Sequence, residues 1–216
     1  MTLQCPVKVA TRFSSAWHHT LTSLIDFNRC ISQGFGENQL PIYHELGLLG
    51  HNGIDVTLEN GDAIYACHDG KIEFAGQDSY TNGPAGLGIV LKTDGYKTIY
   101  WHLQSFAVSP GDMVKMGQLI GYGDNTGMST GPHLHFGLKL LDINGDVINR
   151  NNGYDGAVDP SPYIVWWGMT EQEVKQLQAL EGYSDPAGVA YWTGKPLSEY
   201  LKARLPDKIK TITESI

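Results

Sequence analysis

The sequence lacks the features that would point to a membrane or to a nucleic acid. None of its 216 residues belongs to an apolar run long enough to span a bilayer, and Lys and Arg form no cluster. The formal net charge is −8, which argues against a surface that binds phosphates or anionic lipids. We therefore expect no nucleic-acid partner and no membrane span. The sequence leaves the oligomeric state open.

Cysteine is scarce, and no leader pattern is visible. The three cysteines are Cys5, Cys30 and Cys67, without any C-x-x-C pair. An odd count with no pair spacing is poor evidence for a disulfide framework, so we expect buried thiols. The first residues show no basic stretch followed by an apolar one, so we expect no ordinary secretory signal peptide.

Glycine is abundant, and short strands follow from the pattern around it. There are 26 glycines, 41% of residues are apolar, and only 18% are charged. This suits one core of short strands and tight turns with a small appendage. Ile54, Val56 and Leu58 alternate with polar residues, which is the period of a strand. The same reasoning predicts strands over residues 63–66, 71–75, 88–93, 97–102 and 133–141. We expect a mainly β, antiparallel folded sheet, because no space remains for helical crossovers.

The pattern changes to helical after residue 167. Thr170 and Glu173 have capping-box spacing, and apolar residues follow at helical intervals until Gly182. We therefore predict three parts. Residues 1–30 form an N-terminal segment of uncertain structure, residues 31–167 the main β domain, and residues 168–216 a small helical appendage.

Three short motifs gather metal-binding chemistry. His51 precedes Asp55 by four positions, His133 and His135 flank a leucine, and His102 ends a strand-like run. Zinc binds imidazole nitrogen and carboxylate oxygen, and a catalytic site leaves its fourth position to water. Residues two apart on a strand face the same side, so His133 and His135 point together. If their strand lies beside that of Asp55, three ligands can converge on one Zn2+ and one histidine remains unligated.

Each motif alone is weak evidence. An H-x-x-x-D pair often occurs by chance, an H-x-H on a strand is more often structural, and a lone histidine after an aromatic residue is usually a core residue. Their combination in one glycine-rich β frame favours a zinc site. Bound zinc lowers the pKa of water to about 7, and spare histidines nearby can take its proton or stabilise an oxyanion.

These motifs carry a family resemblance. From about Gly34 to Pro162 the sequence resembles the M23 (LytM/lysostaphin-like) zinc metallopeptidases, which cleave peptides of bacterial peptidoglycan. The matching strings are Gly50-His51-Asn52-Gly53-Ile54-Asp55, Ala66-Cys67-His68-Asp69-Gly70, Tyr100-Trp101-His102-Leu103, Val108 to Gly121, and Thr126 to Phe136 with its Ser129-Thr130-Gly131-Pro132-His133-Leu134-His135. The resemblance implies a barrel-sandwich-like, LytM-type sheet with a narrow groove over one zinc ion.

The resemblance also implies roles for individual residues. His51, Asp55 and His135 would bind the zinc. His102 and His133 would flank the water as catalytic residues, and the sequence does not say which one is the general base. Tyr100 and Trp101 would line the substrate groove, together with loops over residues 76–87 and 142–160.

The sequence departs from the family pattern in places. The stretch from Gly36 to His51 is longer than usual and contains His44, which we interpret as a solvent-exposed loop histidine. His68 stands where the family usually has a small residue, and we interpret it as a surface variant.

The function that follows is a zinc-dependent endopeptidase hydrolysing cross-bridge or stem peptides of peptidoglycan by metal-activated water. Without a visible leader, a phage lysin or virion-associated lysin acting on the cell wall is a reasonable setting. The alternative is a non-catalytic LytM-like module that binds cell wall or regulates other hydrolases. Since all five family positions are filled, activity is favoured. A structural zinc protein would instead close a four-ligand shell with His133.

Overall fold

The computed structural model describes residues 1, 3–7, 31–78, 85–165, 175 and 186. Residues 1–7 and 28–165 belong to one compact unit. The predicted helical appendage over residues 168–216 lies almost wholly outside the described residues, as do Cys30 and most of the predicted segment 1–30. No helix in the described part of the chain is long and apolar enough to cross a membrane.

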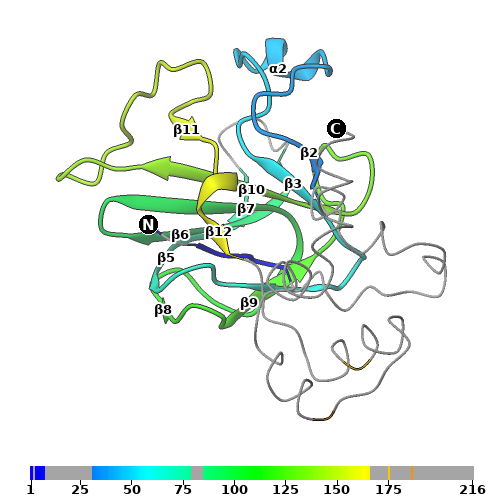
Figure 1. The fold of residues 1–216 in the computed structure, drawn as a ribbon, viewed down its shortest axis with the longest axis vertical. Helices are drawn as coiled ribbons and strands as arrows, with labels where there is room; N and C mark the ends of the chain where they lie inside the picture. Colours follow the sequence, from blue (N-terminus) through cyan, green and yellow to red (C-terminus); the bar gives the residue numbers. More distant parts are fainter. Residues whose placement is uncertain (2, 8–30, 79–84, 166–174, 176–185, 187–216) are drawn as a thin grey trace. The chain divides into compact units, whose positions relative to one another are not determined.

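Short strands dominate this unit (Figure 1). The strands are β1 (Leu3–Gln4), β2 (Ile31–Gln33), β3 (Ile54–Thr57), β4 (Ala63–Tyr65), β5 (Gly70–Gln77), β6 (Leu87–Thr93), β7 (Tyr96–Phe106), β8 (Met113–Val114), β9 (Leu119–Gly123), β10 (His133–Leu140), β11 (Ala157–Val158) and β12 (Ile164–Val165). One turn of α-helix, α2 (Ile42–Glu45), and one 3-10 turn, η4 (Ser161–Tyr163), complete the described elements.

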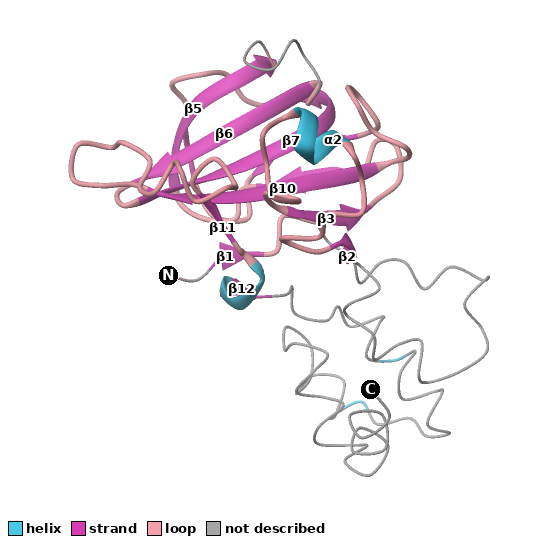
Figure 2. Cartoon of the chain, turned by 90° about the horizontal axis from the view of Figure 1, so that it is seen from above, coloured by secondary structure: helices cyan, strands magenta, loops and turns pink. Residues whose placement is uncertain are grey.

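One 10-stranded antiparallel sheet forms the body. Its main path runs β2-β3-β10-β7-β6-β5-β8, and Figure 2 shows β5, β6, β7, β10, β3 and β2 side by side in that order. The strand β9 pairs with both β4 and β7, and β11 pairs with β10. The strands β1 and β12 form a separate parallel pair. The predicted mainly β, antiparallel fold is confirmed.

Three central strands bring distant parts of the chain into register. On β10, His135 lies directly opposite Asp55 of β3 and Trp101 of β7. The residues flanking His135, Leu134 and Phe136, are fully buried on the other face. Because side chains alternate along a strand, burying these two apolar residues turns His135 to the opposite face.

A bulge in β7 redirects the next histidine. Leu87 of β6 pairs with Leu103 of β7, but Ile89 pairs with Tyr100, so two residues of β7 stand opposite one of β6. His102 adopts a φ of 65° at this point. Its ring centroid lies 6.3 Å from that of His135, on the face that Trp101 also shares through its pairing with His135. The bulge thus lets Trp101 and His102, adjacent in sequence, serve one face of the sheet.

The expectation that Tyr100 lines the groove is wrong. Its side chain is fully buried on the other face of β7, with its ring 5.4 Å from that of Phe136. Its hydroxyl accepts a hydrogen bond from the Cys67 amide at 3.1 Å and contacts Cys67 Sγ at 2.9 Å and Thr98 Oγ1 at 3.2 Å. Burial is the main reason that the pKa of the Tyr100 phenol lies well above its usual range. Tyr100 therefore belongs to the core.

The interpretation of His68 as a surface variant is also wrong. The residue is 4% exposed, and its Nε2 lies 3.0 Å from Thr98 Oγ1. It extends the same buried polar network, whereas His44 is exposed as expected. Cys67 is a buried thiol whose pKa is raised by burial to about 12, and Cys5 is buried as well, so the expectation of buried cysteines is confirmed for these two.

Replacing Tyr100→Phe should lower the free energy of unfolding by about 1–3 kcal/mol, because the Cys67 amide would lose its acceptor in the core. Urea denaturation followed by circular dichroism measures this change. Tyr122→Phe is the matched control, since Tyr122 is 37% exposed on β9. Equal stability of the two variants would show that the buried hydroxyl contributes nothing.

Candidate metal centre

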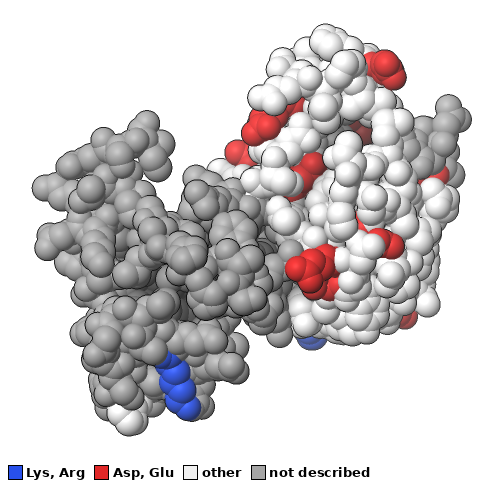
Figure 3. Space-filling view, turned by 90° about the vertical axis from the view of Figure 1, so that its right-hand side faces the viewer, with Lys and Arg blue, Asp and Glu red and all other residues white. Residues whose placement is uncertain are grey.

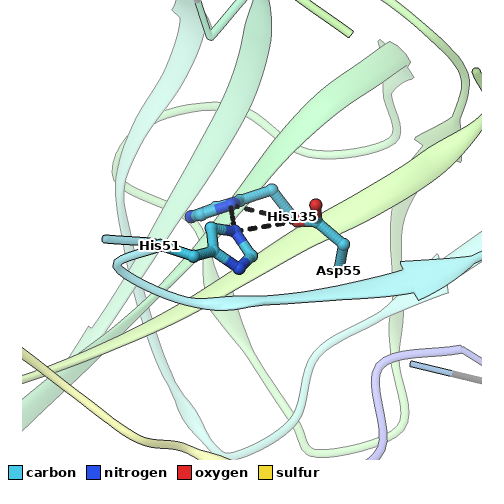
Figure 4. Close-up of side chains that lie close together, drawn as sticks. All are labelled: His51, Asp55 and His135. Carbon is cyan, nitrogen blue, oxygen red and sulfur yellow. Dashed lines mark hydrogen bonds and ion pairs between the residues drawn. The ribbon is translucent and has the colours of Figure 1, made fainter. Parts of the chain in front are cut away.

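Three of the predicted site residues meet at one point on the sheet. Figure 4 shows His51, Asp55 and His135 turned toward one another. The His51 Nε2 and His135 Nδ1 atoms are 2.9 Å apart. Asp55 Oδ1 lies 3.1 Å from that His51 nitrogen and 3.3 Å from that His135 nitrogen. The sheet supplies two of these side chains through the register of β3 and β10, and the turn before β3 supplies the third.

The carboxylate at this point is buried and incompletely bonded. Asp55 is 8% exposed, and its Oδ1 has no partner with hydrogen-bond geometry within the described residues. Burial alone would raise the pKa of Asp55, but the polar contacts with His135 and His51 outweigh it and hold the pKa below its usual range. A buried, ionised oxygen without a hydrogen bond is costly unless a cation satisfies it.

The spacing of the three atoms fits zinc. Zinc–ligand bonds are close to 2.05 Å for nitrogen and oxygen, so ligand atoms around one tetrahedral centre lie about 3.3 Å apart. The observed separations of 2.9, 3.1 and 3.3 Å agree with that value. The donor set, two imidazoles and one carboxylate, is one that zinc prefers. His51, Asp55 and His135 therefore could hold one Zn2+.

Backbone groups orient the first of these ligands. His51 Nδ1 lies 3.1 Å from the carbonyl of Gly34, which can only accept, so Nδ1 carries the proton and Nε2 presents a lone pair. The backbone of His51 also exchanges hydrogen bonds with Gly36 and Glu37. The Tyr43 ring packs 5.8 Å from the imidazole. The long stretch before His51 thus fixes this ligand.

The backbone of Gly53 packs closely against the second histidine, His135. A Cβ atom at Gly53 would lie 2.8 Å from Cε1 and Nε2 of His135 and 2.7 Å from the carbonyl oxygen of Phe136. Only glycine leaves space there, so sterics require a glycine at this position between His51 and Asp55.

The two remaining predicted histidines lie beside this cluster. The rings of His102 and His133 are 4.6 Å apart, and His133 Nε2 lies 3.5 Å from Asp55 Oδ2. His102 Nδ1 donates to the Thr126 carbonyl at 2.7 Å, and His133 Nδ1 donates to the Gly131 carbonyl at 2.8 Å. In the described chain His133 does not join the three-residue cluster of potential ligands.

The electrostatics keep His102 neutral. Burial lowers the pKa of its imidazole to about 4; the carbonyl of Thr126 opposes this shift, and the charges of His133 and His135 add to it. Burial likewise lowers the pKa of His135. At pH 7 the Nε2 atom of His102 therefore carries a lone pair. A ring in this state can accept a proton from a water molecule.

Sequence reasoning missed the groups that orient the imidazoles. They are the carbonyls of Gly34, Thr126 and Gly131 and the hydroxyl of Ser129, which lies 3.1 Å from His133 Nδ1. The carbonyls have no residue-type signal, because every residue has one. Ser129 lies four positions before His133 in the same motif, and this proximity in sequence is the one signal that could have identified it as a partner of that histidine.

The surroundings contain the predicted groove elements. Trp101 is half-buried, and its ring packs edge-on at 6.1 Å from Phe74. The stretch before His51 meets the 142–160 excursion through the Phe35 and Tyr154 rings, 4.7 Å apart, and through a Leu49 amide bonded to the Gly153 carbonyl. The stretch before His51 thus contacts the predicted 142–160 wall, whereas most of the other predicted loop, 76–87, lies outside the described residues.

Comparison with known proteins identifies the family of this chain. The model of peptidase family M23 matches residues 49–150. The solved catalytic domain of lysostaphin, an antimicrobial peptidase from Staphylococcus simulans, superposes with a TM-score of 0.52 and 31% identity, over 67% of this chain and 97% of that domain. The chain belongs to peptidase family M23.

Two curated relatives of this M23 chain are longer proteins. Glycyl-glycine endopeptidase ALE-1 of Staphylococcus capitis is 41% identical over 134 residues, which cover 61% of this chain and 33% of that protein. Peptidoglycan DD-endopeptidase ShyC of Vibrio cholerae is 36% identical over 117 residues, which cover 54% of this chain and 26% of that protein. The M23 chain thus spans about a third of these relatives or less.

Replacing Asp55→Ala should abolish stoichiometric zinc binding, with affinity reduced by more than about 100-fold, since even loss of a group that orients a ligand costs 10–100-fold. Metal analysis after equilibrium dialysis measures the bound zinc. The matched control, Asp94→Ala, removes an exposed carboxylate at the other end of β6 and β7 and should bind one ion. Full zinc content in Asp55→Ala would contradict the ligand set.

The lowered pKa of His102 predicts acid sensitivity of the chelator-treated protein. Between pH 6.5 and pH 4 the unfolded state binds more protons than the folded state, so stability is complete above pH 6.5 and decreases as the pH falls. Asparagine tolerates a positive φ, so it suits this position. Over this pH range the free energy of unfolding of His102→Asn should decrease by up to about 3 kcal/mol less than that of the wild type. Urea denaturation from pH 7.5 to pH 4.5 measures it. The exposed His44→Asn should retain the wild-type slope; the same slope in His102→Asn would contradict the assignment.

Proposed function

We propose that the protein is a zinc-dependent endopeptidase that hydrolyses peptide bonds in bacterial peptidoglycan. One observation supports this most strongly. Three ligand-type atoms with zinc-like spacing lie beside two further imidazoles whose protons are fixed on the far nitrogen. A structural site would need only the ligands, whereas water-based hydrolysis also needs groups that manage a proton.

The division of labour follows from the contacts. His51, Asp55 and His135 would hold the metal, which would make water more acidic and polarise the scissile carbonyl. His102 and His133 direct Nε2 toward the space beside the cluster, because a backbone carbonyl holds each Nδ1 proton. From there they accept the proton of the attacking water and donate to the oxygen that develops charge. Either ring can take either part.

The names of the relatives and the elements around the site support an inference about the substrate class. One relative is named as a glycyl-glycine endopeptidase and another as a peptidoglycan DD-endopeptidase. We infer that the substrate is a peptide strand of the cell wall, lying between Trp101 and the paired walls formed by residues 36–50 and 142–160. The position as a phage or virion-associated lysin stays a prediction.

The surface charge of the protein bears on whether it binds nucleic acid. Figure 3 shows acidic side chains distributed over one face of the described part, with little basic surface. Together with the net charge of −8, this surface would repel a polyphosphate chain. A peptide of the cell wall needs no basic patch, so the absence of a nucleic-acid partner stays our prediction.

Purified sacculi with glycine cross-bridges and with direct stem cross-links should both be incubated with the protein. We expect new peptide termini, identified by mass spectrometry, from at least one wall type. His133→Ala should lower the rate by about 10²–10⁴-fold, the usual contribution of a positioned proton-transfer group. Chelation should stop cleavage, and added zinc should restore it.

Asp94→Ala is the control for general damage and should cleave like the wild type. No new termini from any wall would sink the peptidase proposal and favour the non-catalytic module. Undiminished cleavage by His133→Ala would overturn the role of that histidine alone.

A further inference from the structure

The bulge in β7 creates a gap in the sheet next to His102. Leu87 of β6 and Leu103 of β7 are partners in register. The hydroxyl of Thr126 enters between their backbones. It donates to the Leu103 carbonyl at 2.7 Å and accepts from the Leu87 amide at 3.1 Å. One side-chain hydroxyl therefore bridges the two strands where the bulge interrupts their ladder.

The same residue holds the imidazole of His102. The Thr126 carbonyl accepts from His102 Nδ1 at 2.7 Å, the shortest hydrogen bond that any imidazole nitrogen of this cluster makes within the described residues. The hydroxyl and the carbonyl of Thr126 thus act together: the first fixes where the segment lies, and the second fixes which nitrogen of His102 carries the proton.

The neighbouring backbone is fitted to this contact. Gly86 has a φ of +70°, and a Cβ atom there would lie 2.5–2.6 Å from the carbonyl carbon and oxygen of Thr126 and from the next amide nitrogen. A side chain at position 86 would push the carbonyl out of place. The residue just before β6 is therefore a glycine, which lets the peptide after Thr126 pack tightly.

We propose that Thr126 is a positioning residue, whose hydroxyl clamps the β6–β7 bulge so that its carbonyl holds His102 in the tautomer with a free Nε2. The proposal concerns the same site as the proposed function, and the kinetic part of its test depends on that function. The position of the imidazole itself does not. Thr126 touches neither substrate nor metal in this role; it acts through His102.

The decisive variant is Thr126→Val, which keeps the shape and the carbonyl but removes the hydroxyl. Thr126→Ser restores the hydroxyl. Thr93→Val is the matched control, because Thr93 lies at the far end of the same strand, β6. Each protein is labelled with 15N-histidine and studied by long-range 1H–15N correlation NMR, both zinc-loaded and chelator-treated, since this spectrum distinguishes the two imidazole tautomers.

We expect the wild type, Thr126→Ser and Thr93→Val to show His102 protonated on Nδ1 alone. Thr126→Val should show averaged nitrogen shifts from mixed tautomers. On cleavable sacculus fragments its kcat should fall by about 10–100-fold with little change in KM, and Ser should restore it, as for groups that orient a reacting side chain.

An unchanged His102 tautomer in Thr126→Val would overturn the proposal, as would a tautomer mixture in Thr126→Ser equal to that of the valine variant. If the wild type cleaves no wall, the proposed function fails, but the NMR comparison still decides the role of Thr126. A loss of kcat without a tautomer change also counts against it, because the hydroxyl would then act by another route.

Discussion

The pairing register of three antiparallel strands determines everything else in this site. His135 on β10 faces Asp55 on one side and Trp101 on the other, so a candidate ligand pair and a predicted groove residue arise from one row across the sheet. A slip of one residue would turn His133 and His135 into the core and bring Leu134 and Phe136 to the surface. Both apolar residues are fully buried, which makes that slip costly in free energy. Hydrophobic burial on one face thus enforces the geometry of the candidate ligands His135 and Asp55 on the other.

Backbone carbonyls add the second level of control. Each of His51, His102 and His133 has its Nδ1 proton fixed by a carbonyl, belonging to Gly34, Thr126 and Gly131 respectively. Peptide carbonyls cannot change protonation state, so this arrangement sets the tautomers without adding titrating groups to the site. It leaves Asp55 as the carboxylate that would balance the charge of a cation bound at the three-residue cluster.

Much of this could be predicted from the sequence, for a physical reason. Alternation revealed the strands around Asp55 and His135, since a sheet with one buried face has a period of two. The ligand trio followed from residue chemistry together with the family resemblance, and the geometry agrees with it. The register could not be predicted, because pairing is a property of two strands and each sequence segment describes only one.

The predictions that failed have separate physical reasons. The prediction that Tyr100 lines the groove with Trp101 is wrong, because the bulge places Trp101 and His102 on one face and leaves Tyr100 on the other. The interpretation of His68 as a surface variant rests on the small residue usual at that position in the family. Nothing local in the sequence indicates Thr98, 30 positions away, as its partner. Short β2 was missed since three residues cannot show a period.

The strained backbone of His102 indicates a position where stability is lost in favour of a fixed side-chain placement. A φ of 65° at a histidine costs about 1 kcal/mol or more, and it persists only where the surroundings fix it. At His102 they do so from three directions: its carbonyl accepts from the Asp124 amide, its amide donates to the Ala85 carbonyl, and its ring is held by Thr126. The Asp124 carbonyl in turn accepts from the His133 amide. The backbone of Asp124 therefore links the backbones of the two histidines whose imidazoles lie beside the three-residue cluster.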